Sequence, residues 1–183
     1  PAEEYRNGLG EVVKHALLMT AQSFESLEAN ATAVAARDLA ILAEIAKANV
    51  TFKATVVEDD ERESGRRAIL NLGHTTAHAL ELAAGYGSLG HGYAVALGLL
   101  VSLAISESLL GLDPSVRDRT RTLLQRLGLP TSIPLPSMGI LIEAMGRDKK
   151  VTADSQGFVG LKAIGAPVWG IDVPRAALVA ALE

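Results

Sequence analysis

The sequence contains no cysteine among its 183 residues and has few aromatic side chains. The absence of cysteine excludes disulfides and thiolate ligands, so any bound metal must be held by nitrogen and oxygen atoms. It also agrees with a cytoplasmic location. Aromatic residues make up 4% of the chain against 49% hydrophobic residues overall. The core must therefore be built from Ala, Leu, Ile and Val, which favours packed helices over a β-sandwich.

The sequence also lacks an excess of positive charge and a long uninterrupted apolar run. Its formal net charge of -4 does not favour binding to the negatively charged backbone of nucleic acid. We find no apolar run of membrane-spanning length and no signal-peptide pattern, so neither a membrane nor nucleic acid is an expected partner. The chain begins at Pro1 without an initiator methionine. We interpret it as a piece of a longer protein.

The spacing of apolar residues predicts an all-α fold, a multi-helix bundle in one helical domain over residues 1–183. Residues 157–173 have poor helical periodicity and favour one small β-hairpin. Glycine and proline signals separate the helices. The expected helices cover residues 3–28, 32–57, 66–82, 94–110, 116–127, 138–145 and 174–182.

Three of the four histidines lie close together, at His74, His78 and His91. His74 and His78 are four residues apart, which places both rings on one face of a helix. The glycine-rich residues 85–90 can turn the chain back toward them. A single imidazole on a helix is more often a hydrogen-bonded core or surface group. Three of them around a glycine turn favour a metal site.

A carboxylate could complete such a site, and Glu11 is the best candidate by pattern. It interrupts an apolar helical face, where an unpaired charge would be costly. The alternative is a surface glutamate paired with His15, four residues later. Lys14 follows Glu11 by three residues and shares its face.

Further polar residues suit an anionic, oxygen-rich substrate beside a metal. On a single helix, Arg67, Asn71 and the histidines at 74 and 78 would form one stripe. Lys53 interrupts the apolar pattern of the preceding helix, and Lys149 belongs to a late basic cluster at residues 147–150. The alternative interpretation of the stripe is a solvated helix face, and that of the cluster is an exposed loop.

Four segments together resemble a known family. Residues 5–14, residues 70–75 with His78, residues 91–98 and residues 148–150 occur in the order found in the carboxy-terminal helical domain of dehydroquinate synthase, within the sugar-phosphate cyclase superfamily. That family converts 3-deoxy-D-arabino-heptulosonate 7-phosphate to 3-dehydroquinate and phosphate, the second step of the shikimate pathway that leads to chorismate and the aromatic amino acids. It uses bound NAD and a divalent metal, usually zinc, with cobalt as an alternative.

The resemblance implies a role for each candidate residue. Glu11, His74 and His91 correspond to the metal ligands. His78 then corresponds to a residue that acts on the substrate and not to a fourth ligand. The implied catalytic residues are Lys14, Glu63 and His78, and the implied substrate-binding residues are Lys53, Arg67, Asn71 and Lys149. The choice between Lys149 and Lys150 stays open.

The resemblance also implies partners. No strand with a glycine-rich phosphate turn precedes Glu11. We therefore expect the amino-terminal NAD-binding domain to lie outside this chain, with the site in the cleft between the two domains and the enzyme a homodimer. Two departures from the family pattern, Tyr93 and Thr76-Ala77, do not affect a proposed ligand.

Three alternatives remain. Another sugar-phosphate cyclase, making an inosose or a valiolone, would share the metal set. Lys53 and Arg67 favour instead a substrate that carries a carboxylate. A metal-dependent alcohol or glycerol dehydrogenase would have a similar helical domain but net redox chemistry. A helical binding module would make the histidines incidental.

Overall fold

The computed structural model describes residues 1–62, 65–85, 88–132, 141, 145 and 157–182. Within them the chain is mainly helical with one two-stranded antiparallel sheet, which confirms the predicted fold class and the hairpin. The elements are α1 (Ala2–Met19), α2 (Ala21–Ala35), α3 (Leu39–Asp59), η1 (Arg66–Asn71), α4 (His74–Ala84), α5 (His91–Leu110), α6 (Pro114–Arg126), β1 (Phe158–Ala163), β2 (Ala166–Ile171) and α8 (Arg175–Leu182).

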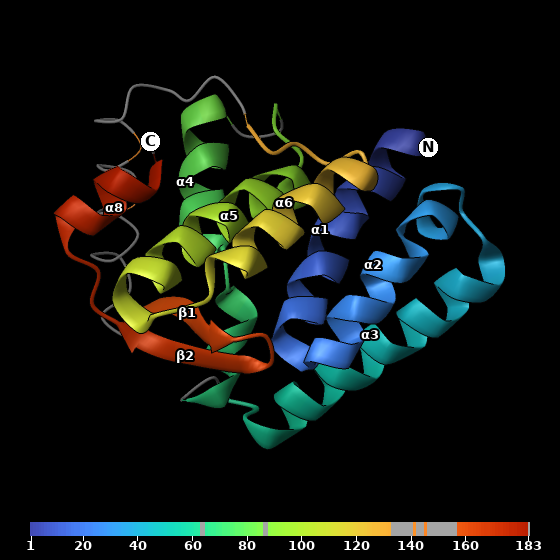
Figure 1. Ribbon diagram of the computed structural model, residues 1–183, viewed down its shortest axis with the longest axis horizontal. Coiled ribbons are helices and arrows are strands. Elements are labelled where there is room, and N and C mark those ends of the chain that lie inside the picture. The colour runs from blue at the N-terminus through green and yellow to red at the C-terminus, as the bar shows by residue number, and fades with distance from the viewer. Residues whose placement is uncertain (63–64, 86–87, 133–140, 142–144, 146–156, 183) are drawn as a thin grey trace.

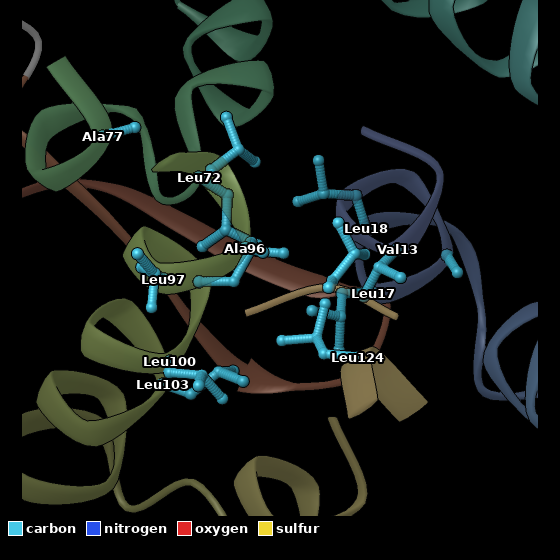
Figure 2. Packing of buried hydrophobic residues seen from close by; sticks show 14 of the residues in the cluster. Val13, Leu17, Leu18, Leu72, Ala77, Ala96, Leu97, Leu100, Leu103 and Leu124 are labelled. Atoms are coloured by element: carbon cyan, nitrogen blue, oxygen red, sulfur yellow. The ribbon is translucent and has the colours of Figure 1, made fainter. Parts of the chain in front are cut away.

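Helix α5 lies at the centre of the fold. It packs against α1, α4, α6, α8 and β1, and these elements surround it in Figure 1. Leu99 and Leu103 on α5 are completely buried, as is Leu17 on α1. Figure 2 shows this packing, with leucines of α1, α5 and α6 meeting in one apolar cluster. The many Gly, Ala and Ser residues of α5 let neighbouring helices pack close to it. Because the helices lie close together, few large aromatic side chains are needed to fill the space between them.

Helix α5 is also long and apolar enough to cross a membrane by length and composition. Its most apolar 18-residue window has a mean hydropathy of 1.9 and is 61% buried inside the fold. The expectation from the sequence that no segment reaches this length was therefore too strict. Burial on this scale is typical of the central helix of a globular core.

The first two helices differ from their predicted bounds. Residues 3–28 were expected to form one helix, but α1 ends at Met19 and α2 begins at Ala21. Thr20 lies between them in an extended conformation, and its hydroxyl accepts a hydrogen bond from the Ser23 N–H at 3.1 Å. This is an N-cap, which satisfies a donor that the helix start would leave free. Asp38 caps α3 in the same way.

The predicted helix over residues 66–82 is interrupted. Residues 66–71 form the 3-10 helix η1, and α4 begins only at His74. Gly73 between them has a φ of 82°, a left-handed conformation that glycine adopts without strain. Periodicity alone missed this break because the apolar spacing continues across it.

The later elements follow the prediction more closely. Helix α5 starts at His91, three residues before its predicted start, and Gly111 ends it with a φ of 72°. Asp113 and Pro114 restart the chain as α6. The terminal helix α8 is also confirmed. The predicted short helix at 138–145 falls almost wholly outside the described residues, although Leu141 and Met145 are helical and buried.

The hairpin is attached to α5 by one buried hydroxyl. Ser106 on α5 accepts a hydrogen bond from the Leu161 N–H at 3.0 Å and donates one to the Ser102 carbonyl at 2.6 Å. Apolar residues of β1 complete the contact with the core. The sequence suggested a hairpin but not this anchor.

Two contacts between glycines set the positions of α1, α4 and α5. A Cβ atom on Gly10 of α1 would overlap the backbone of Gly92 on α5. A Cβ atom on Gly98 of α5 would overlap the carbonyl group of Gly73, just before α4. Only glycine allows the backbones to approach so closely at these positions. The residues next to these glycines include Glu11, His74 and His91.

We predict that Gly10→Ala destabilises the protein by about 2–3 kcal/mol, because the added methyl group meets backbone that cannot rotate away. Gly8 is the matched control on the same helix, since it is exposed and a Cβ there would have no neighbour within 4 Å. Gly8→Ala should stabilise by roughly 0.5–1 kcal/mol. Urea denaturation of both variants measures the difference. Equal stabilities would contradict the close crossing of α1 and α5.

A second prediction concerns the hairpin anchor. Ser106→Ala leaves the buried Leu161 N–H without its acceptor and should cost about 1–3 kcal/mol of unfolding free energy. Ser102→Ala is the control, because the Ser102 hydroxyl is buried without a partner among the described residues. Its loss should change stability by less than about 0.5 kcal/mol or increase it. A larger loss in the Ser102 variant than in the Ser106 variant would refute the anchor.

Candidate metal centre

Three of the predicted site residues come together from distant parts of the chain. Glu11 lies within α1, while His74 and His91 are the first residues of α4 and α5. One donor atom from each lies within 4.8 Å of the others. The Glu11 Oε1 atom is 3.6 Å from His74 Nε2 and 3.7 Å from His91 Nε2. A divalent cation takes donors of this kind and number.

Hydrogen bonds on the far side of each ring set which nitrogen faces this centre. His74 Nδ1 lies 3.3 Å from the Leu72 carbonyl oxygen, and His91 Nδ1 lies 3.1 Å from Glu81 Oε1. Both oxygens can only accept, so each Nδ1 carries a hydrogen. In the neutral ring the Nε2 lone pair is then free and directed at the centre.

The pKa of His74 supports a neutral ring. Burial and the nearby Lys14 ammonium lower this pKa from its ordinary value to about 4. At neutral pH the contact with Glu11 is therefore not an ion pair. The Glu11 Oε1 atom is itself buried and has no hydrogen-bond partner among the described residues. A carboxylate oxygen that faces the lone pair of neutral His74 and lies beside a second imidazole nitrogen is unfavourable unless a cation lies among them, so the residues fit a metal ion.

The other oxygen of Glu11 pairs with lysine. Lys14 Nζ lies 2.7 Å from Glu11 Oε2 and is almost fully buried. Burial alone would raise the pKa of Glu11, but Lys14, with smaller effects from His74 and His15, holds this pKa below its ordinary value. Burial lowers the pKa of Lys14 despite the carboxylate. The pair keeps Glu11 ionised, which is the form that binds a cation.

A pocket of about 400 Å³ opens beside this group. This volume is in the range of sites for small molecules. Its lining combines the donor set with cationic and amide side chains. The lining residues are Glu11, Lys14, His15, Lys53, Arg67, Leu70, Asn71, His74 and His91.

The pocket brings together most of the predicted site residues, but not along one helical stripe. Arg67 and Asn71 lie on η1, whereas His74 and His78 lie on α4 beyond the break at Gly73. Asp60 holds the start of η1, because its carboxylate accepts hydrogen bonds from the Gly65 and Arg67 backbone N–H groups at 2.8 and 3.0 Å. The predicted single stripe is therefore wrong, although Arg67 and Asn71 still reach the pocket.

His78 is close to the centre without lining the pocket. Its ring centroid lies 5.6 Å from that of His74 and 6.3 Å from that of His91, and the side chain is exposed. It does not belong to the group of donors that could share one ion. Two other predicted residues, Glu63 and Lys149, lie outside the described residues, as does Lys150.

Two residues near the centre did not appear among the predicted site residues. Glu81 contacts His91, and its place seven residues after His74 on the same helix was a signal for it. His15 was considered only as a partner of Glu11. It lines the pocket, its Nδ1 lies 2.7 Å from Asn49 Oδ1, and its ring packs edge-on against Phe52. Burial, followed by the effect of Lys14, lowers the pKa of His15.

The fold is shared with solved sugar-phosphate cyclases. The 2-epi-5-epi-valiolone synthase of Streptomyces hygroscopicus, solved with NAD+ and Zn2+ bound, superposes with a TM-score of 0.89 at 24% identity, covering 100% of this chain and 51% of that one. A 2-deoxy-scyllo-inosose synthase, solved with carbaglucose-6-phosphate, NAD+ and Co2+, gives a TM-score of 0.82 at 22% identity over 100% and 52% of the two chains. At these identities the likeness shows the fold alone.

Curated relatives are more similar in sequence. The 3-dehydroquinate synthase of Nitrosospira multiformis is 40% identical over 97% of this chain and 49% of its own length. That of Acidithiobacillus ferrooxidans is 39% identical over 100% and 50%. The chain thus spans about half the length of these relatives. The family model described as 3-dehydroquinate synthase C-terminal matches residues 8–151. This match covers most of the chain, which therefore belongs to the family of 3-dehydroquinate synthase C-terminal domains.

Proposed function

We propose that this chain is the metal- and substrate-binding half of a 3-dehydroquinate synthase. The reaction converts 3-deoxy-D-arabino-heptulosonate 7-phosphate to 3-dehydroquinate and releases phosphate. The observation that carries the proposal is the orphaned Glu11 Oε1 atom facing two imidazole nitrogens, in a pocket lined by cationic side chains. Membership of the family and curated relatives of that name support it.

The proposed metal ligands are Glu11, His74 and His91. Their donor atoms are two nitrogens and one carboxylate oxygen, a set that suits zinc and also cobalt. Three protein ligands leave a coordination position for substrate, as catalytic zinc sites require. When bound, the metal supplies a Lewis acid that makes a substrate hydroxyl easier to deprotonate.

The cationic lining residues bind and orient the substrate in this proposal. Arg67 can hold a carboxylate or phosphate with two parallel hydrogen bonds, and Lys53 adds a compact charge. Asn71 offers an amide for the sugar hydroxyls. Lys14 keeps Glu11 ionised and directs its own ammonium into the same pocket. Fixing a flexible, multiply charged substrate in one geometry is a large part of catalysis.

Three catalytic or binding assignments rest on the family resemblance. His78 is beside the centre and exposed, and it is not one of the donors that could share an ion, so it can exchange a proton with the substrate without ligating the metal. Glu63 as an active-site acid and Lys149 as a substrate contact stay predictions, because both lie outside the described residues.

The proposal requires partners beyond this chain. We propose that an NAD-binding half, within the length of the relatives that this chain does not span, supplies the cofactor for a transient oxidation. Hydride would return before product is released, so NAD would end unchanged. We also expect a cytoplasmic homodimer, which sedimentation of the full-length protein can test.

The ligand assignment is tested by metal content. We predict that His74→Ala loses stoichiometric zinc, with at least about a hundredfold drop in affinity, because one of three protein ligands is gone. His78→Ala is the matched control four residues along α4, and it should keep zinc while losing most activity. Dialysis followed by elemental analysis of the full-length protein measures both. Loss of zinc in the His78 variant alone would contradict the assignment.

The reaction is tested by product analysis. With NAD and zinc, the full-length protein should release phosphate from 3-deoxy-D-arabino-heptulosonate 7-phosphate without accumulating NADH. Arg67→Lys should lower kcat/KM by about tenfold or more, because a single ammonium cannot make two parallel contacts. Phosphate release only from a sugar phosphate lacking a carboxylate would favour another cyclase. Steady NADH production from an alcohol would indicate a dehydrogenase.

A further inference from the structure

We infer that Glu81 is a positioning residue, which holds the His91 imidazole in the orientation and protonation form that binds the metal. The inference rests on the metal centre proposed above and deepens it. Glu81 lies on α4 and His91 begins α5, so their contact joins these two helices. The Glu81 Oε1 atom lies 3.1 Å from His91 Nδ1.

The two proposed histidine ligands are held by different kinds of group. His74 Nδ1 faces the carbonyl oxygen of Leu72, two residues away, and this backbone acceptor is fixed by the local chain. The side chain of His74 is 15% exposed, whereas that of His91 is 44% exposed. His91 therefore has less packing to hold its ring. Among the described residues, the Glu81 carboxylate is the only hydrogen-bond acceptor that contacts the His91 ring, apart from Glu11 in the proposed metal centre.

A carboxylate behind an imidazole has two effects on the ligand. It accepts the Nδ1 hydrogen, which leaves the Nε2 lone pair for the metal. Its negative charge also makes the ring a stronger electron donor. The Glu81 side chain is 19% exposed, so this charge is only partly screened by solvent. Outer contacts of this kind typically change metal affinity by about 10- to 100-fold.

The geometry separates Glu81 from the ligands themselves. Glu81 is not part of the group whose donor atoms could share one ion, which consists of Glu11, His74 and His91. It contacts the opposite nitrogen of the His91 ring from the one that faces Glu11. Its effect on the metal must therefore pass through His91.

The test compares cobalt and zinc binding by the full-length protein and four variants. Competition with a chromophoric chelator gives the affinity, and the visible absorption of bound Co2+ reports the ligand geometry. Glu81→Gln keeps the length and one acceptor oxygen but removes the charge, whereas Glu81→Ala removes both. His74→Ala removes a ligand. Glu58→Gln is the charge control, because Glu58 is exposed at the end of α3.

We expect Glu81→Gln to weaken zinc binding by about tenfold and Glu81→Ala by up to about a hundredfold. The Co2+ spectrum should shift in both, whereas a residue that only stabilised the fold would leave it unchanged. His74→Ala should bind no stoichiometric metal, and Glu58→Gln should match the parent protein. Far-UV circular dichroism checks folding. If the Ala variant is unfolded, the near-isosteric Gln variant decides the question.

Two failures are distinguishable. If the parent protein and the His74 variant bind equally little metal, the proposed centre fails and the role of Glu81 fails with it. If the parent protein binds metal, His74→Ala loses it, and both Glu81 variants keep the parent affinity and Co2+ spectrum, the centre stands and the role of Glu81 is refuted.

Discussion

The candidate site depends on two places where helix backbones touch. At Gly10 and Gly92 the backbones of α1 and α5 meet, and at Gly73 and Gly98 the start of α4 meets α5. Each of the three proposed ligands is the chain neighbour of one of these glycines. Side chains at the contacts would push the helices apart by more than the reach of a metal–ligand bond allows. The close packing of α1 and α4 against α5 is therefore also what brings the three proposed ligands together.

The two carboxylate oxygens of Glu11 have different electrostatic surroundings. Oε2 pairs with Lys14, which keeps the carboxylate ionised in a half-buried position, while Oε1 faces His74 and His91 without a hydrogen-bond partner. A buried group left in this state normally costs stability. An oxygen left in this state at the edge of a pocket suits a site that is completed by a ligand, since binding would recover the lost interaction.

The sequence predicted much of this arrangement and missed identifiable parts. The helical class, the hairpin and the terminal helix follow from periodicity and turn residues, and Glu11 was selected because a charge interrupted an apolar face. The break at Gly73 was missed because apolar spacing runs on across it. Glu81 was missed because its partner His91 lies on the next helix, so its spacing from His74 within α4 did not identify the contact that it makes. Contacts between different helices cannot be predicted from the spacing within one helix.

The degree of exposure of the centre has a chemical consequence. The side chain of His91 is 44% exposed and that of Glu11 is 32% exposed, so the proposed centre lies near the surface of this chain although the Glu11 Oε1 atom itself is buried. Transient oxidation by hydride transfer requires a site from which water is excluded, because electrostatic contacts weaken and reactive intermediates hydrolyse in bulk solvent. A second surface must therefore close over the pocket during the proposed reaction. The proposed cofactor-binding half would supply that surface, since it would also have to bring the nicotinamide within reach of the substrate carbon. In this view the lysines and arginine of the pocket do more than bind substrate. In the proposed reaction they would hold the charged substrate at the surface until closure removes its water, and their positive charge would offset the cost of that desolvation.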